Sequence, residues 1–259
     1  MKNNFVIVPA RGGSKGIKNK NLQKVFGKPL VVRSINHAKI ILPDNRIILS
    51  TDSTKIINEV AKYFKIAFKL PNKNSISNFG PFLIHYRSSR LAGDKSLISD
   101  TLFDIRANLL RLNQEIDKIC LLQPSSPFRS TKELLKVRKL MSKPGGKKIS
   151  KLSVVKVEDN HPARMYKLDS SHNLIRLNGY SKYKHARRQD LPITYIRDGG
   201  FYIIGDQLIK DKIQYSDSPT PIIREFPNSL NIDSRLDLIT VSVIESENML
   251  IGDPNEDIR

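Results

Sequence analysis

The sequence predicts an α/β domain with a mainly parallel, three-layer α/β/α sheet. Short apolar runs of the kind found in buried strands alternate with helical patterns over about the first 140 residues, which is the order that such sheets require. A glycine-rich polar loop follows the first strand, and beyond Pro144-Gly145-Gly146 the pattern becomes more strand-like and less regular. For 259 residues we predict a single domain, 1–259, in which 150–195 is a smaller strand-rich extension.

Each predicted element has its own local signal. Residues 4–9 form an apolar, β-branched run bounded by proline, which predicts a buried strand. Residues 28–41 place apolar side chains at helical spacing, with Pro29 in the first turn. Asp52 or Ser53 is placed to cap the helix after the second strand. The other predicted elements are strands at 46–50, 66–70, 118–123, 153–157, 165–168, 174–177 and 193–204, helices at 52–64, 98–113, 131–141 and 234–250, and a loop at 71–86.

Composition excludes several classes of protein. The chain has 44 Lys and Arg, 25 Asp and Glu and 39% hydrophobic residues, which is typical of a globular domain rather than a disordered chain. No apolar run approaches the ~18 residues that a membrane span needs, and the apolar stretch before Arg11 is too short for a signal-peptide core. The one cysteine, Cys120, excludes an intrachain disulfide. We therefore expect a cytoplasmic protein without a membrane partner.

The net charge of +19 is concentrated in three stretches that contain no acidic residue. Residues 1–43 hold nine cations, 134–157 hold eight and 170–189 hold five, whereas 225–259 hold eight acids against two cations. This asymmetry favours a polyanionic partner, which is nucleic acid, anionic lipid or a small phosphorylated substrate. For most of the individual lysines, solvated surface is the favoured explanation.

The loop at 9–21 has the composition of a phosphate-binding site. It leaves the first strand at its carboxyl end, where open α/β sheets bind ligands, and its three glycines let backbone N–H groups approach an anion. Arg11, Lys15 and Lys20 supply positive charge and Ser14 a hydroxyl, which suits a triphosphate with about four negative charges. The chain contains neither a Walker A motif nor G-x-G-x-x-G at this position.

The same loop also matches a motif of serine hydrolases. Gly12, Ser14 and Gly16 fit G-x-S-x-G, the turn that presents a nucleophilic serine. Such a serine needs a base, and none of the five histidines is an evident partner for it. Because cations surround Ser14, phosphate binding is the favoured interpretation.

A set of motifs continues in order from the loop to about residue 240. The two most specific are VPARGGSKG at 8–16 and LQPSSPFR at 122–129. The others are ILSTD at 48–52, LAGD at 91–94, HP at 161–162, RQDLP at 188–192, DGGFYI at 198–203 and ID at 232–233. The ordered set resembles the acylneuraminate cytidylyltransferases, which are the CMP–sialic acid synthetases and their relatives.

This resemblance implies a Rossmann-like nucleotidyltransferase that couples CTP to a nonulosonic acid, a nine-carbon 2-keto sugar acid, and releases pyrophosphate. The anomeric 2-hydroxyl attacks the α-phosphorus of CTP, which requires in-line positioning and charge neutralisation. The implied site residues are Arg11, Lys15 and Lys20 as the catalytic clamp on the triphosphate, Ala10, Arg11, Ser14, Asn21 and Arg87 for the nucleotide, and Gln123 and Arg188 for the sugar.

Mg²⁺ is the expected cofactor, because it bridges nucleotide oxygens and is usually held by one or two carboxylates plus water. The family pattern is Asp-x-Asp, whereas this chain has Asn231-Ile232-Asp233, so an amide replaces the first carboxylate. Asp233 is the principal candidate ligand and Asp237 the second. Asp233 also precedes Ser234 and a helical pattern, so an N-cap role is the alternative for Asp233.

The resemblance further implies a homodimer in which the 150–195 extension packs against a second subunit and contributes to its sugar site. Three departures from the family pattern indicate a divergent branch. They are Asp198 where the family has Asn, Arg90 in place of the acid before Leu-Ala, and an insertion at 71–86. The sugar acid that it uses is therefore one of several nonulosonic acids, namely sialic, legionaminic, pseudaminic or a related acid. The resemblance implies that the product serves cell-surface polysaccharide synthesis.

Two alternative functions follow from the same sequence. A basic nucleic-acid-binding protein is suggested by the net charge, but the chain has no helix-turn-helix, zinc-finger or RNP motif. A 3-deoxy-manno-octulosonate cytidylyltransferase, which acts on an eight-carbon acid, is the second alternative. The segment QPSSP at 123–127 is closer to the motif of the enzymes for nine-carbon acids than to that of this branch. We therefore expect CTP and a nonulosonic acid as partners, and no specific nucleic acid.

Overall fold

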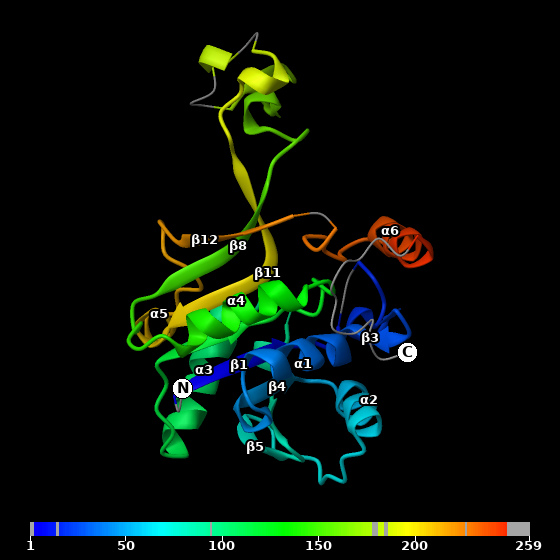
Figure 1. Cartoon of the computed structure of the whole chain (residues 1–259), viewed down its shortest axis with the longest axis vertical. Helices are drawn as coiled ribbons and strands as arrows, with labels where there is room; N and C mark the ends of the chain where they lie inside the picture. The colour runs from blue at the N-terminus through cyan, green and yellow to red at the C-terminus, as the bar shows by residue number, and fades with distance from the viewer. Residues whose placement is uncertain are drawn as a thin grey trace.

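An eight-stranded sheet runs through the molecule (Figure 1). The computed structural model describes residues 3–13, 16–93, 95–177, 181–183, 186–225 and 227–247. In sheet order the strands are β12 (Thr220–Arg224), β8 (Ser150–Lys156), β11 (Tyr195–Gly205), β7 (Lys118–Leu121), β1 (Asn4–Pro9), β4 (Ile47–Thr51), β6 (Phe82–Tyr86) and β5 (Ser75–Phe79). Neighbours from β7 to β6 are parallel, as are β12 and β8, whereas β11 and β5 run antiparallel to their neighbours. The predicted mainly parallel sheet is confirmed.

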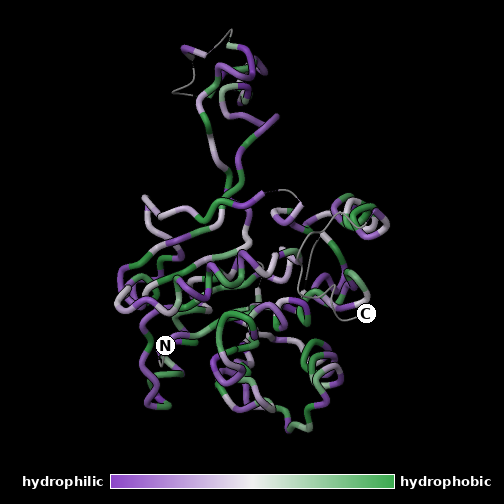
Figure 2. Tube along the Cα trace, viewed as in Figure 1, coloured by the Kyte–Doolittle hydropathy of each residue, from purple (hydrophilic) through white to green (hydrophobic). Residues whose placement is uncertain are grey.

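Helices cover both faces of this sheet. Helices α1 (Leu30–Ile41), α2 (Thr54–Phe64) and α4 (Thr131–Ser142) lie on one face, and α3 (Ile98–Arg111) and α5 (Asp206–Lys210) on the other. Alternate side chains of β1 enter the two cores, since Val6 packs with α1, α2 and α4 while Phe5 packs with α3 and α5. The apolar colour of the central strands in Figure 2 reflects this burial on both sides. The three-layer architecture is thereby confirmed.

The structure contradicts the predicted strand at 66–70 and the predicted loop at 71–86. Residues 66–74 contain no strand, and β5 and β6 form an antiparallel hairpin inside the supposed loop. Phe82 and Ile84 enter the core under α1 and α2, whereas His85 on the opposite side of β6 bonds Asp104 of α3. Both sides of β6 are buried in the sheet. This burial stabilises the strand more than the nearby polar and turn-forming residues disfavour it. The hairpin ends directly before Arg87.

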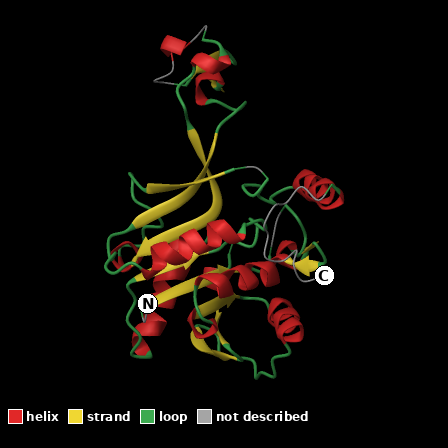
Figure 3. Cartoon of the chain, viewed as in Figure 1, coloured by secondary structure: helices red, strands yellow, loops and turns green. Residues whose placement is uncertain are grey.

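The chain between β8 and β11 projects from the body of the molecule (Figures 1 and 3). Its described part contains one short hairpin, β9 (Tyr166–Leu168) with β10 (Leu174–Arg176), and three single-turn 3₁₀ helices. Residues 150–156 lie in the central sheet as β8, so the projecting segment begins after them rather than at 150. Helix α6 (Arg235–Ser246) ends the described chain near the short β2 (Lys24–Val25) and β3 (Lys28–Pro29) ribbon. Among the described residues, no helix is long and apolar enough to cross a bilayer.

Candidate active site

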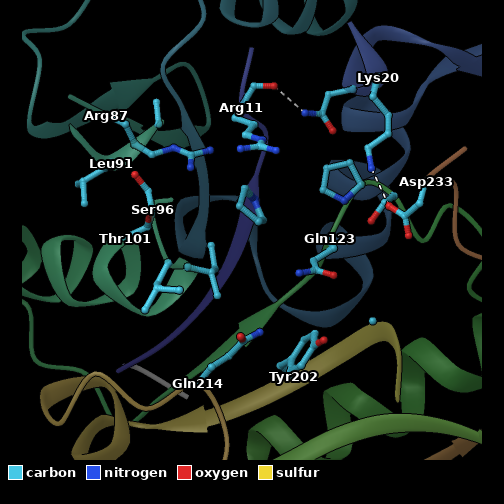
Figure 4. A pocket seen from close by; sticks show the side chains of 18 of the residues that line it. Arg11, Lys20, Arg87, Leu91, Ser96, Thr101, Gln123, Tyr202, Gln214 and Asp233 are labelled. Carbon is cyan, nitrogen blue, oxygen red and sulfur yellow. Dashed lines mark hydrogen bonds and ion pairs between the residues drawn. The ribbon is translucent and has the colours of Figure 1, made fainter. Parts of the chain in front are cut away.

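A cleft of about 710 Å³ lies at the carboxyl edge of the parallel strands (Figure 4). The segments that follow β1, β6 and β7 all contribute to its wall, because the carboxyl ends of parallel strands meet at one edge of a sheet. Residues of β11 and the segments before and after β12 close the remaining side. Of the predicted site residues, the structure brings Arg11, Lys20, Asn21, Arg87, Gln123 and Asp233 together in this lining.

The loop after β1 is fastened where it enters and leaves the cleft. The side-chain amide of Asn21 donates to the carbonyl of Arg11 at 2.8 Å, and the N–H of Gly12 donates to Asp52 Oδ1 at 2.9 Å. These bonds hold both ends of the loop against the strand edge, so that the side chains of Arg11 and Lys20 reach the cleft (Figure 4). Ser14 and Lys15 lie outside the described residues. Ala10 does not line the cleft, because its methyl group is in the core and its N–H bonds Ser50.

Lys20 and Asp233 form an ion pair at the cleft, 2.9 Å from Nζ to Oδ1. The lysine side chain is 19% exposed and the carboxylate 71% exposed. An ion pair with such an exposed partner stabilises a fold by only ~0–1 kcal/mol. Either group can therefore exchange this partner for a charged ligand at little cost, which suits a lysine that binds phosphate.

Arg87 is a buried cation whose Nε has no protein partner. Its Nη2 donates to the carbonyl of Ser50 at 2.8 Å, whereas its Nε is buried without a protein partner. Burial lowers the pKa of the guanidinium to about 10, although the carboxylate of Asp52 acts in the opposite direction. The side chain thus remains charged at neutral pH and is one of the residues that line the cleft.

Three residues form a polar wall facing the cleft: Gln123, Gly199 and Asn231. Gly199 has φ of +73°, and a Cβ there would lie 2.9 Å from Gln123 Oε1, so glycine is required at this contact. Asn231 Nδ2 donates to the carbonyl of Asp198, whereas its Oδ1 is buried without a protein partner. The wall therefore presents polar groups that are already placed before any ligand binds.

Two predicted residues lie elsewhere. Arg188 is on the projecting segment, where it pairs with Glu158 at 2.7 Å and Asp159 at 3.1 Å, and it does not line this cleft. Asp237 does not line the cleft either, and its Oδ2 accepts hydrogen bonds from the N–H groups of Asp233 and Ser234. Ser234 is the N-cap of α6 in a capping box with Asp237, so the alternative that Asp233 is the cap is wrong.

Several lining residues were not predicted. Thr101, Arg197, Tyr202 and Gln214 also line the cleft, and Figure 4 labels Thr101, Tyr202 and Gln214. Tyr202 belongs to the DGGFYI motif, so its position in the motif was the available signal. Arg197 and Gln214 reach the cleft from segments with no motif, and Arg197 donates to the hydroxyl of Tyr215 at 2.5 Å.

Comparison with known protein families assigns the chain to one of them. A family model for cytidylyltransferases matches residues 5–252 of the chain. The chain belongs to the cytidylyltransferase family. The resemblance inferred from the motifs is therefore confirmed, and so is the assignment of the protein as a nucleotidyltransferase.

Individual relatives of this cytidylyltransferase have several related names. The CMP-N,N'-diacetyllegionaminic acid synthase of Legionella pneumophila is 28% identical, over 90% of this chain and 92% of its own. The pseudaminic acid cytidylyltransferase of Campylobacter jejuni is 30% identical, over 77% of each chain. The N-acylneuraminate cytidylyltransferase of Escherichia coli is 27% identical over 94% of this chain but 52% of its own, so this chain spans about half of that relative.

Solved structures support the fold independently. CMP:2-keto-3-deoxy-manno-octonic acid synthetase complexed with CTP has a TM-score of 0.58 at 13% identity, covering 95% of this chain and 99% of its own. 4-Diphosphocytidyl-2C-methyl-D-erythritol synthase from Anaerococcus prevotii has a TM-score of 0.54 at 11% identity, covering 95% and 96%. At these identities the likeness establishes the fold alone, and it confirms the predicted Rossmann-like nucleotidyltransferase fold.

Proposed function

We propose that this cytidylyltransferase couples CTP to a nonulosonic acid, giving the CMP-sugar and pyrophosphate. The observation that carries the proposal is the cleft itself, in which Arg11, Lys20 and Arg87 share a wall with Gln123. Cations suited to a triphosphate thus lie beside an amide suited to sugar hydroxyls. Relatives named for legionaminic, pseudaminic and N-acylneuraminic acids support the choice of a nonulosonic acid.

The reaction is a single displacement at phosphorus. The anomeric hydroxyl oxygen of the acid forms a bond to the α-phosphorus, the bond from that phosphorus to the bridging oxygen of the β-phosphate breaks, and the hydroxyl proton is released. Negative charge therefore grows on the departing pyrophosphate. Arg11 and Lys20 are placed to neutralise this charge, which is the main contribution that a protein makes to such a transfer.

The lining also suggests how the two substrates share the cleft. Arg87 and Ser96 lie together at one side of the cleft (Figure 4), where we place the base of CTP. Gln123 and Tyr202 lie at the other side, toward β11 (Figure 4). With the nucleoside beside Arg87 and the sugar beside Gln123, the triphosphate would lie along the loop that carries Arg11.

Mg²⁺ fits the residues present. Asp233 offers an exposed carboxylate at the cleft, and the buried Oδ1 of Asn231 has no protein partner. The described part of the chain contains no group of three His, Cys, Asp or Glu residues that could hold a metal ion, so substrate oxygens and water must supply most ligands, as is common for Mg²⁺. We propose that Asp233 binds the ion and Asn231 accepts a hydrogen bond from one of its waters. When bound, Mg²⁺ neutralises charge on the triphosphate.

The projecting segment supports a homodimer. Its described residues expose several large apolar side chains, namely Leu168, Leu174, Ile175 and Ile193. Burial of such residues is the usual reason for association. We propose that the segment packs on a second copy and brings Arg188 to the sugar end of the neighbouring cleft, and that the enzyme works in the cytoplasm, where CTP is present.

The direct test is pyrophosphate release in a screen of the four nucleoside triphosphates against a panel of nonulosonic acids with Mg²⁺. We expect release with CTP and one of the acids, and a loss of about 100-fold in Lys20→Met. Lys18→Met is the matched control, because Lys18 is exposed on the same loop and does not line the cleft. Absence of release with every acid, together with no rise in melting temperature on adding CTP, would contradict the proposal.

A further inference from the structure

Two arginine side chains are buried behind the polar wall of the cleft. Arg129 is 0% exposed and Arg224 is 2% exposed. A buried cation destabilises a fold unless it is paired and fully hydrogen-bonded. The partners of these two arginines therefore indicate which parts of the wall they hold in place.

Arg224, at the end of β12, connects four separate segments. Its Nη1 pairs with Asp198 Oδ2 at 2.7 Å, and its Nε pairs with Glu133 Oε1 of α4 at 2.9 Å. Its Nη2 donates to the carbonyls of Phe128 at 2.5 Å and of Asn228. The planar guanidinium thus links β11, α4, the turn after β7 and the segment after β12, a set of contacts that a lysine cannot reproduce.

Arg129 connects the two segments that face the cleft. Its Nε donates to the carbonyl of Gly200 at 3.0 Å and its Nη2 to the carbonyl of Gln123 at 2.9 Å. Burial, and next the charge of Arg224, lower its pKa to about 9. Asp198 and Glu133 balance the two positive charges, so the cluster has no net charge.

The backbone at Gly200 is fitted to this cluster. A Cβ there would lie 1.9 Å from Arg224 Nη1, so only glycine lets the guanidinium approach Asp198. Asp198 Oδ1 in turn accepts from the N–H of Gly200 at 3.2 Å and from Ser153. These contacts hold an irregularity in β11, where the register with β8 shifts between Arg197 and Tyr202. Gly199, which faces the cleft, lies within that irregularity.

We propose that Arg224 is a positioning residue for the sugar acid: it fixes the part of the wall formed by Gln123 and Gly199 before substrate binds, by holding Asp198 and the turn after β7. This inference rests on the proposed function for the identity of the substrate. Arg224 has no contact with Arg87, Lys20 or Asn21 among its hydrogen bonds and ion pairs in the described part of the chain. Loss of the contacts that its guanidinium makes through Nε, Nη1 and Nη2 should therefore affect the sugar side of the cleft more than the nucleotide side.

The kinetic test uses Arg224→Lys, which keeps the positive charge but removes the planar guanidinium and its set of donors. We expect KM for the sugar acid to rise about tenfold or more, while KM for CTP changes less than about twofold. Arg106→Lys is the matched control, because Arg106 makes a two-bond ion pair with Asp206 between α3 and α5, away from the cleft. We expect it to leave both KM values unchanged. Equal effects of Arg224→Lys on both substrates, or none, overturn the proposal.

A second measurement needs no substrate and no assumption about the reaction. In Arg224→Lys, hydrogen–deuterium exchange should accelerate in peptides covering 123–126 and 198–201 and stay unchanged in those covering 20–25. If Arg224→Lys does not fold, Asp198→Asn replaces it in this measurement. This variant keeps the side-chain shape, and we expect the same exchange pattern. If exchange accelerates as expected but no acid is turned over, the proposed function fails and the positioning role stands. Uniform or absent acceleration overturns the positioning role itself.

Discussion

Arg87 carries its charge in a place where the fold alone gives it few partners. It makes one bond to the carbonyl of Ser50, and its Nε is buried and unsatisfied. The fall of its pKa from 12.5 to about 10, caused mainly by burial, corresponds to roughly 3 kcal/mol of unfavourable free energy for the charged form. Since the folded pKa is the lower one, this cost is constant at neutral pH and is relieved only as pH rises above about 10.

The first prediction concerns Arg87→Met. Removing a buried cation whose Nε is unpaired should leave the melting temperature of the free protein unchanged or higher, whereas the rise in melting temperature on adding CTP should disappear. Differential scanning fluorimetry with and without CTP measures both. Arg106→Met is the control, and because it breaks a well-formed ion pair it should lower the melting temperature and keep the CTP effect. A large loss of stability in Arg87→Met with the CTP effect retained would show that the arginine is structural.

At the residue scale, sequence reasoning found the side chains that lie within compact motifs. Lys20 and Asn21 belong to the loop that follows β1 and Gln123 to the turn that follows β7, so their arrival at one edge of the sheet follows from the topology. Arg197 and Gln214 could not be found this way, because the irregularity in β11 and the segment before β12 bring them to the cleft. Such placement depends on tertiary packing that no local pattern encodes.

Helix α6 shows how an element end determines which carboxylate faces the cleft. Asp237 is turned back toward its own helix N-terminus, where backbone N–H groups are otherwise without partners. Burial opposes ionisation of Asp237, but the hydrogen bonds from Asp233 and Ser234 outweigh it and lower the pKa. Asp233, one residue before the cap, is left exposed beside Lys20.

The second prediction separates these two carboxylates. Asp233→Asn should raise the Mg²⁺ concentration needed for half-maximal pyrophosphate release, because it removes the proposed ligand. Asp237→Asn should leave that concentration unchanged and lower thermal stability by about 1 kcal/mol, the usual contribution of a cap. A Mg²⁺ titration of both variants with a melting curve for each provides the comparison. A raised Mg²⁺ requirement in Asp237→Asn would return this residue to the metal site.

Strands β4 and β6 are tied to α3 by a buried histidine. His85 Nδ1 lies 2.9 Å from Ser50 Oγ and its Nε2 lies 2.8 Å from Asp104 Oδ2. Burial lowers the pKa of His85 below its usual value of 6.5, although its bond to Asp104 acts in the opposite direction. The unfolded chain therefore binds a proton at a higher pH than the folded chain does. Stability is fully present above about pH 6.5 and is lost as pH falls below it.

The third prediction is that His85→Gln weakens this acid sensitivity. The melting temperature of the native protein should fall as the pH is lowered from 7 to below the normal histidine pKa of ~6.5. The fall should be smaller in the variant. His172→Asn is the control, because His172 is exposed and has a positive φ that asparagine tolerates. Equal slopes for the native protein and His85→Gln would show that another group is responsible.

The same strand shows why part of the fold escaped prediction. Strand β1 and strand β7 are continuous apolar runs with clear boundaries, and both were found. In β6, His85 interrupts the apolar pattern, and Pro81 and Gly80 precede it. Only the packing of Asp104 and Ser50 against His85 makes that polar residue compatible with a central strand. In the segment predicted as a strand at 66–70, Ile66 and Phe68 pack against the core, but the segment does not join the sheet.

For the whole molecule, the net charge of +19 divides into a small functional part and a larger remainder. Among the described residues, the cations that line the cleft are Arg11, Lys20, Arg87 and Arg197. The acid-free stretch after β7 lies instead on the exposed side of α4 and in the turn after it, for example at Lys136 and Lys143. Bulk charge therefore indicates little about specific binding, whereas the position of cations at the strand edge indicates the candidate site.

The fourth prediction tests whether two copies share a sugar site. If Arg188 serves the neighbouring cleft, Gln123→Ala and Arg188→Ala should each be inactive, but heterodimers of the two should contain one cleft with both native residues. Random mixing of protomers should then restore about a quarter of native activity. Arg187→Ala is the control, because Arg187 pairs with Asp190 on the same segment and should stay active alone. Coexpression with two affinity tags isolates the heterodimer. Activity that stays absent in the isolated heterodimer would show that the clefts are not shared, and full activity of Arg188→Ala alone would remove this arginine from the site.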